Sequence, residues 1–124
     1  MAHNTCGDSV FRALSPDDLE NFNQGRRILP KGIGGSIEEH VQGYPTKYIS
    51  AAESLEGARK FLGPSGIAEI DVKKLLKSGS GIVHHENVIQ KLNRPHDIKN
   101  TEEAFEILIT KGIDPSAIID IILK

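Results

Sequence analysis

Residues 8–18 read DSVFRALSPDD, a stretch that joins a short apolar run to the start of a helix. The run that ends at Leu14 has the length and composition of a strand. Ser15 is a typical N-cap, Pro16 suits the first helical position, and the two aspartates that follow complement the helix dipole. The sequence therefore predicts a strand over 8–14, followed at once by a short helix that ends near residue 23.

The rest of the chain repeats this alternation of short elements. The further segments expected from apolar periodicity and turn signals are strands at 47–51, 67–72, 105–109 and 118–123 and helices at 36–41 and 54–62, whereas 82–92 fits either state. Twelve glycines and six prolines in 124 residues interrupt the chain too often for a helical bundle. The strands also follow one another too closely for regular β-α-β winding. We expect one α+β domain over residues 1–124, with residues 1–8 flexible.

Composition and charge exclude several classes of protein. Fifteen basic and seventeen acidic residues give a net charge of -2, which indicates no partner class, although residues 59–99 carry eight basic and four acidic side chains. Cys6 is the only cysteine, so an internal disulfide and a thiolate zinc site are excluded. The five histidines lack regular ligand spacing, which predicts no metal site. The apolar runs are too short to cross a membrane, and the first residues lack the apolar region of a classical export signal.

Three polar residues lie within or at the end of apolar strands. Arg12 needs a carboxylate, a carbonyl or a ligand phosphate, and an ion pair with Asp8 or with an acid on another strand is the simplest partner. Ser50 ends a strand next to a helix start, where a serine is usually a cap but can also order a neighbouring carboxylate or arginine. Glu106 needs a partner unless its strand is at the edge of the sheet.

Seven segments of the chain, taken in order, resemble the conserved segments of a known family. The segments that carry the resemblance are FRALSPDD (11–18), SIEEHV (36–41), KYIS (47–50) with Ala58 and Phe61, GIAEID (66–71), EILI (106–109), GIDP (112–115) and Ala117-Ile118. They are similar to the ADP-ribosyltransferase superfamily, and more narrowly to the ADP-ribosyltransferase-like domains at the C-termini of bacterial polymorphic toxins. The resemblance implies a small split β core, mixed or antiparallel, with short helices.

The resemblance also implies a reaction and a site. Arg12 would bind the phosphates or the nicotinamide ribose of NAD, the substrate, and Tyr48 would stack on nicotinamide. Ser50 would support the site, and Glu106 would bind a ribose hydroxyl and stabilise an oxocarbenium-like transition state. Ala104 stands two residues before Glu106, where many protein-modifying members carry Glu or Gln, and this difference argues against arginine as the acceptor.

The same resemblance implies a biological setting. The chain would be an antibacterial effector, secreted or delivered by contact, that modifies a protein or an RNA in the cytoplasm of a competing cell. A cognate immunity protein would neutralise it, and no insertion into a membrane is expected.

Two other functions stay open at the level of the sequence. A metal-independent toxin ribonuclease acting on RNA such as tRNA would use His84 or His85 with Glu106 and Arg12, although a loop pair of exposed histidines explains the same residues. A non-catalytic binding module would place Arg12 and Glu106 in different environments. His40 is expected to be a surface or structural histidine.

Overall fold

The architecture is taken from a computed structural model of the chain, which describes residues 8–61 and 65–122. Residues 1–7 of the segment 1–8 that is expected to be flexible fall outside the described residues, as do the expected ends of a helix at Leu62 and of a strand at Leu123. The elements of the described chain are β1 Ser9–Ala13, α1 Pro16–Asn23, α2 Ile37–Val41, β2 Tyr48–Ala52, α3 Leu55–Ala58, β3 Ile67–Asp71, α4 Val72–Lys77, β4 Gly81–Val83, α5 His85–Gln90, α6 Pro95–Ala104, β5 Glu106–Thr110, the 3-10 turn η1 Pro115–Ala117 and β6 Ile118–Ile122.

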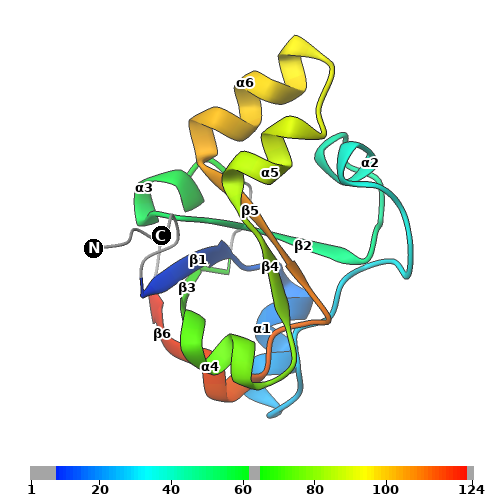
Figure 1. The fold of residues 1–124 in the computed structure, drawn as a ribbon. Coiled ribbons are helices and arrows are strands. Elements are labelled where there is room, and N and C mark those ends of the chain that lie inside the picture. Colours follow the sequence, from blue (N-terminus) through cyan, green and yellow to red (C-terminus); the bar gives the residue numbers. More distant parts are fainter. Residues whose placement is uncertain (1–7, 62–64, 123–124) are drawn as a thin grey trace.

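The strands form one antiparallel sheet in the order β4-β5-β2-β1-β3-β6 (Figure 1). Its two halves, β4-β5-β2 and β1-β3-β6, are paired along their lengths, but β1 meets β2 at a single register pair, Phe11 with Ala52. The sheet is therefore split between β1 and β2. This confirms the expected α+β fold with a small split core, and every strand pairing in it is antiparallel.

Aliphatic side chains from both halves of the sheet form the core. Val10, Ile49, Ile70, Ile107 and Ile109 belong to one cluster and are all at most 3% exposed. Helices α5 and α6 pack against β5, and α4 lies at the opposite end of the molecule beside η1 (Figure 1). The main functional side chains considered below come from β1 and β2, on the two sides of the split, and from β5 and α2.

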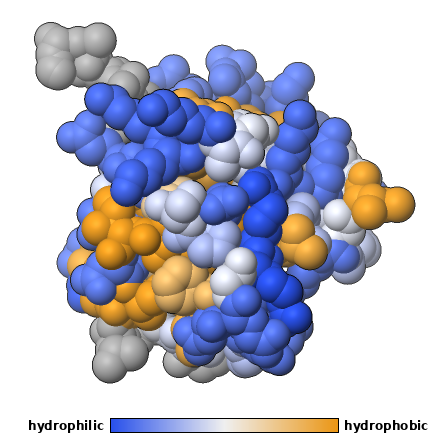
Figure 2. Space-filling model, turned by 90° about the horizontal axis from the view of Figure 1, so that it is seen from below, coloured by the Kyte–Doolittle hydropathy of each residue, from blue (hydrophilic) through white to orange (hydrophobic). Residues whose placement is uncertain are grey.

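The outer surface is largely polar, with separate apolar patches on the face seen in Figure 2. The large apolar side chains with high exposure come from different parts of the fold: Leu29, Ile33, Tyr44, Leu76, Phe105 and Ile119. Isolated exposed apolar residues are common on folded proteins.

Several expectations about secondary structure need correction. Phe105 and Val72, both expected in strands, are the C-cap of α6 and the first residue of α4. The helix expected at 54–62 is the four-residue α3, because Gly57 is a poor helix former and the hydrogen bonds that follow, from Lys60 N–H to Gly57 and from Phe61 N–H to Ala58, close three-residue turns. The ambiguous segment 82–92 divides into the end of β4 and the whole of α5. Helix α6 is not predicted from the sequence, because its buried residues include Asp97 and Thr101 and no large apolar side chain, so the helical apolar period is missing.

Candidate active site

Arg12 projects from β1 and binds two elements at once. Its Nη2 and Nε lie 2.8 and 3.0 Å from Oδ2 of Asp18, and its Nη1 donates to the carbonyl oxygen of Ser50 at 2.7 Å. The prediction that Arg12 pairs with Asp8 or with an acid on another strand is wrong. Asp18 belongs to α1, and the capping interaction with Ser15 fixes its carboxylate there.

Ser50 connects this arginine to the carboxylate. Its hydroxyl donates to Oε2 of Glu106 at 2.7 Å, while its carbonyl accepts from Arg12. Ser50 is not the cap of the next helix, because Ser54 has that role in α3. The structure therefore brings Arg12, Ser50 and Glu106 into one connected cluster.

Glu106 is the first residue of β5, a strand inside the sheet, and is only 5% exposed. Its two oxygens accept hydrogen bonds from Ser50 and, at 3.2 Å, from the hydroxyl of Thr101. Burial raises the pKa of Glu106 above its ordinary value, although the hydrogen bonds from Ser50 and Thr101 and the charge of His85 act in the opposite direction. The carboxyl is thus held in a fixed position at a site where its charge is costly.

His40, expected at the surface or in a structural role, is part of the cluster. The last turn of α2 places its Nε2 2.7 Å from the Ser50 hydroxyl and its Nδ1 2.6 Å from the Thr46 hydroxyl. Burial, followed by the nearby Arg12 charge, lowers the pKa of His40 from 6.5 to about 4, so the ring is neutral at pH 7.

The hydrogen bonds around His40 run in one direction. Ser50 uses its only proton on Glu106, so Nε2–H of His40 donates to the Ser50 oxygen. The Thr46 hydroxyl then donates to Nδ1, and it accepts from the backbone N–H of Tyr48 at 3.2 Å. This order fixes the histidine tautomer and makes Glu106 the terminal acceptor of the chain of hydrogen bonds.

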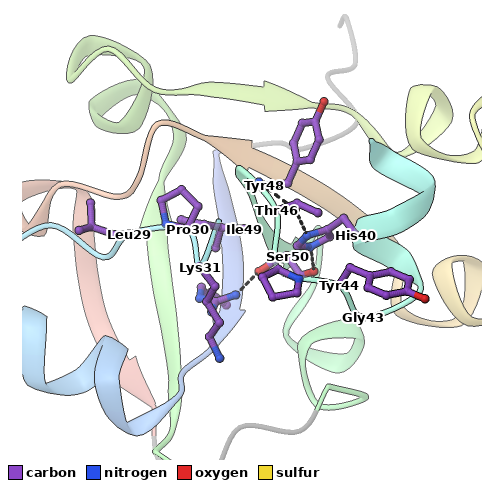
Figure 3. A pocket seen from close by; sticks show the side chains of 12 residues that line it. Leu29, Pro30, Lys31, His40, Gly43, Tyr44, Thr46, Tyr48, Ile49 and Ser50 are labelled. Carbon is purple, nitrogen blue, oxygen red and sulfur yellow. Dashed lines mark hydrogen bonds between the residues drawn. The ribbon is translucent and has the colours of Figure 1, made fainter. Parts of the chain in front are cut away.

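Two adjoining cavities meet at this cluster. The first, called here the arginine cavity, has a volume of about 540 Å³ and is lined by Arg12, Lys31 and Tyr48 among others (Figure 3). The second, the glutamate cavity, has a volume of about 530 Å³ and contains Glu106. His40 and Ser50 line both cavities. Their hydrogen bond therefore lies where a cationic cavity meets one that holds a carboxyl group.

Tyr48 lies in the wall of the arginine cavity. Its ring is 6.0 Å from the ring of His40, centroid to centroid, at 73°, and Nζ of Lys47 is 5.4 Å from its centroid. These contacts orient the ring, and its expected stacking on nicotinamide stays a prediction.

The other histidines of the described chain, His84, His85 and His96, occupy different environments. His84 precedes α5 as its N-cap, and His85 donates from Nδ1 to the backbone carbonyl of Glu106 at 2.9 Å, not to its carboxylate. His96 is exposed and pairs with Asn100 at 3.2 Å. Among the described residues that line the two cavities, His40 is the one histidine. The structure thus does not assemble the expected ribonuclease group of His84 or His85 with Arg12 and Glu106 in either cavity.

The sequence does not predict His40, Thr46, Thr101 or Lys31 as members of these sites. The capping box of Ser36 and Glu39 correctly predicts the helix that carries His40, but its contact with Ser50 depends on how α2 packs on β2. Within residues 8–61 and 65–122, no group of three metal-ligating side chains is close enough to hold a metal ion. In the same ranges, no helix has the length and apolar character that crossing a membrane requires.

No family model matches the sequence, and no curated protein does. Solved structures do match, and they show that the chain has the ADP-ribosyltransferase fold. The Scabin toxin from Streptomyces scabies in complex with NADH superposes with a TM-score of 0.54 at 21% identity, over 90% of this chain and 61% of Scabin. A guanine-specific ADP-ribosyltransferase superposes with a TM-score of 0.56 at 20% identity, over 94% of this chain and 66% of the other. The chain thus spans less than two thirds of either protein.

Proposed function

We propose that the chain is a mono-ADP-ribosyltransferase that uses NAD as its donor substrate. The observation that carries the proposal is the position of Ser50, 2.7 Å from Arg12 through its carbonyl and 2.7 Å from Glu106 through its hydroxyl. One residue thus holds a cation suited to phosphate beside a carboxyl suited to a developing positive charge. The fold shared with Scabin, whose structure contains NADH, supports the same class of donor.

The arginine cavity supplies the groups that would hold the donor. Arg12 and Lys31 both line it, and each can bind a phosphate oxygen, Arg12 through the guanidinium protons that Asp18 and Ser50 leave over. Tyr48 would pack against the nicotinamide ring from the wall of this cavity.

The buried carboxyl supplies the chemistry. When the bond between ribose C1′ and the nicotinamide nitrogen breaks, nicotinamide leaves with the bonding electrons as a neutral molecule, and positive charge develops on the ribose. An ionised Glu106 close to that ribose lowers the barrier electrostatically and accepts a hydrogen bond from a ribose hydroxyl. His40 and Ser50 act as positioning residues, because they fix the carboxyl without carrying charge.

The biological setting follows from the same resemblance. We propose a toxin effector that is secreted or delivered by contact, modifies a protein or an RNA in the cytoplasm of a competing bacterium, and is bound by a cognate immunity protein. The toxin among the structural neighbours supports the first part of this setting.

The donor chemistry is testable with the purified chain. Calorimetric titration with NAD should show saturable binding, and chromatography should detect release of nicotinamide. Glu106→Gln keeps the shape of the carboxyl but not its charge, so it should bind NAD and release nicotinamide at least about 100-fold more slowly. Glu86→Gln, an exposed change in α5, is the matched control and should behave as wild type. A wild-type chain that neither binds nor cleaves NAD would leave a non-catalytic binding module as the better description.

A further inference from the structure

Thr46 is a buried polar residue to which the proposed donor chemistry gives no role. It is 2% exposed and lies in the wall of the arginine cavity, two residues before β2 (Figure 3). Its hydroxyl makes two contacts: it accepts from the N–H of Tyr48 at 3.2 Å and lies 2.6 Å from Nδ1 of His40. A buried hydroxyl whose two partners both belong to the site is a candidate for an indirect role in the reaction.

The Thr46 hydroxyl has one proton and, among the described residues, one acceptor for it. The contact with Tyr48 uses a lone pair of the oxygen, so the proton is directed to Nδ1 of His40. Nδ1 is therefore the unprotonated nitrogen of the neutral ring, and Nε2 carries the hydrogen. At the other end, the Ser50 proton is directed to Glu106, so the Ser50 oxygen accepts from Nε2–H. Both ends of the chain of hydrogen bonds thus select the same histidine tautomer.

The other tautomer of His40 would reverse its contact with Ser50. With the hydrogen on Nδ1, the unprotonated Nε2 would need the Ser50 proton, and Glu106 would lose the donor that holds its Oε2. Among the described side chains, Thr101 alone would then donate to the carboxyl. The tautomer of His40 therefore decides whether the Ser50 hydroxyl donates to Glu106 or to the histidine.

The glycine-rich loop between α1 and α2 holds Thr46 in place. The N–H of Gly32 donates to the Thr46 carbonyl at 2.9 Å, and the N–H of Lys47 donates to the Gly34 carbonyl at 2.8 Å. A Cβ at Gly35, whose φ is +92°, would lie 2.7 Å from Cγ2 of Thr46. Glycine at this position permits both the left-handed backbone and the close approach. The loop is therefore a support for Thr46 from both its main chain and its side chain.

We propose that Thr46 is a positioning residue for the transfer reaction, that it acts on Glu106 through His40 and Ser50, and that the glycine-rich loop keeps it in place. This inference rests on the proposed function. Thr46 selects the histidine tautomer that directs the Ser50 proton to Glu106, and so fixes the carboxyl toward the ribose. Loss of its hydroxyl should therefore slow cleavage of the donor more than it weakens donor binding.

Thr46→Val removes the hydroxyl at nearly constant shape. Nuclear magnetic resonance of the ¹⁵N-labelled full chain at pH 7 reports the tautomer, because the shifts of the two ring nitrogens depend on which one carries the hydrogen. The His40 signals are assigned by their absence in His40→Gln. Wild type should show hydrogen on Nε2 alone, and Thr46→Val should show a mixture of both tautomers.

The same variant is compared with wild type in the nicotinamide assay and by calorimetric titration with NAD. Its kcat should fall about tenfold, the effect of one lost hydrogen bond on a barrier, while its Kd for NAD should stay within about twofold of wild type. A fall in kcat without a matching rise in Kd is the result expected when the carboxyl is displaced and the donor cavity is intact.

Two variants control for the loss of a threonine hydroxyl as such. Thr46→Ser keeps the hydroxyl and should keep both the single tautomer and kcat. Thr110→Val removes a hydroxyl that also accepts a backbone N–H, from Gly81 at 3.1 Å, but Thr110 lines neither cavity. It should show the tautomer and the kcat of wild type, so a general effect on folding is distinguished from an effect on His40.

A pair of glycines tests the support given by the loop. Gly35→Ala should also lower kcat, because its Cβ would displace Thr46. Gly25→Ala requires a similar left-handed backbone, with φ at +73°, but its Cβ meets nothing within 4 Å, and it should keep kcat. Wild-type kcat in Gly35→Ala would overturn the role assigned to the loop.

A double variant tests the route. Adding Thr46→Val to Ser50→Ala should lower kcat by no more than about twofold below Ser50→Ala alone, because the first change then has no hydroxyl through which to act. Losses that multiply would mean that Thr46 affects the reaction by another route.

The outcomes separate this inference from the proposed function. An unchanged tautomer or kcat in Thr46→Val, an equal loss in Thr110→Val, or multiplied losses in the double variant would each overturn the positioning role while the donor chemistry stands. A wild-type chain with the single tautomer that neither binds nor cleaves NAD would overturn the proposed function, and the role of Thr46 in the reaction with it.

Discussion

Ser50 shows how one small residue can organise a site. It is half-buried on β2, and its two oxygens contact an arginine from β1, a histidine from α2 and a glutamate from β5. The sequence identified Arg12, Ser50 and Glu106 because each is a polar residue on or beside an apolar strand. His40 lies in a short polar helix, where a histidine is not unusual, and only the packing of α2 brings it to Ser50.

Replacing Ser50 by alanine should impair activity more than folding. The hydroxyl is lost from Glu106, and Nε2–H of His40 loses its acceptor, so the free energy of unfolding should fall by about 1–3 kcal/mol. Nicotinamide release should fall at least about tenfold, because Glu106 is no longer held in place. Urea unfolding and a nicotinamide assay measure the two effects. Ser54→Ala, which removes the N-cap of α3, should lose about 1 kcal/mol and keep nicotinamide release.

The neutral His40 should make stability depend on pH. Its pKa is about 4 in the folded chain and near 6.5 in the unfolded chain, so the unfolded chain binds the extra proton first as pH falls. The contribution of His40 is therefore fully present above pH 6.5 and is lost as pH falls toward 4. Urea unfolding of wild type and His40→Gln across this range should give a difference in free energy that shifts against wild type as pH decreases. A difference between wild type and His40→Gln that stays constant from pH 7 to pH 4 would contradict this assignment.

At the scale of elements, local signals predict the starts of helices well and their packing poorly. The capping boxes at Ser15 and Ser36 form as the sequence predicts. Helix α6 is missed because it turns Asp97 and Thr101 inward, where Thr101 binds Glu106. Because polar residues of the site occupy the buried face of α6, the sequence lacks the apolar periodicity that would predict this helix. Helix α4 is missed because it begins directly where β3 ends, with Asp71 as its cap.

The contact of α3 with the end of α6 should depend on the missing side chain of Gly57. A Cβ there would overlap the carbonyl oxygen of Ala104, which is backbone and cannot move aside cheaply. Gly57→Ala should therefore lower the free energy of unfolding by about 1–3 kcal/mol, as overpacking does. Gly34→Ala is the matched control, because a Cβ at Gly34 meets nothing within 4 Å. Denaturant unfolding compares the two, and equal stability of both variants would contradict the tight contact.

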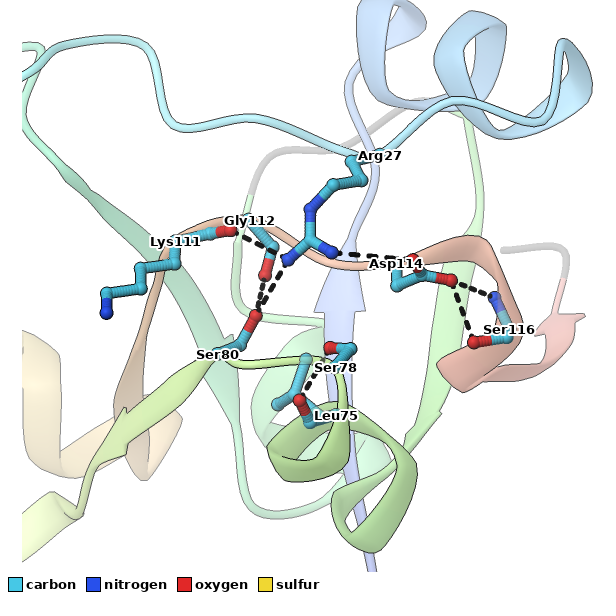
Figure 4. A network of polar contacts seen from close by, with 8 residues as sticks. All are labelled: Arg27, Leu75, Ser78, Ser80, Lys111, Gly112, Asp114 and Ser116. Carbon is cyan, nitrogen blue, oxygen red and sulfur yellow. Dashed lines mark hydrogen bonds and ion pairs between the residues drawn. The ribbon is translucent and has the colours of Figure 1, made fainter.

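At the scale of the whole molecule, two arginines join distant parts of the chain in similar ways. Arg12 links β1 to α1 and β2 beside the two cavities. Arg27 donates to the Ser80 hydroxyl and the Lys111 carbonyl and pairs with Asp114 at 3.4 Å (Figure 4). Arg27 lines neither cavity. Comparing Arg12 with Arg27 therefore distinguishes an arginine that stabilises the fold from one that can also bind a ligand.

Conservative replacement of each arginine should divide these roles. A lysine carries the charge but cannot bind carboxylate and carbonyl in the guanidinium geometry. Arg27→Lys should lower the free energy of unfolding by about 1–3 kcal/mol and leave NAD affinity unchanged. Arg12→Lys should lose a similar amount of stability and also raise the Kd for NAD by about 10- to 100-fold, since a charge-assisted hydrogen bond contributes about 1.5–3 kcal/mol. Urea unfolding and calorimetric titration of both variants make the comparison. Equal NAD affinity of the two variants would mean that Arg12 only stabilises the fold, and the arginine cavity would then lose its assignment as the donor site.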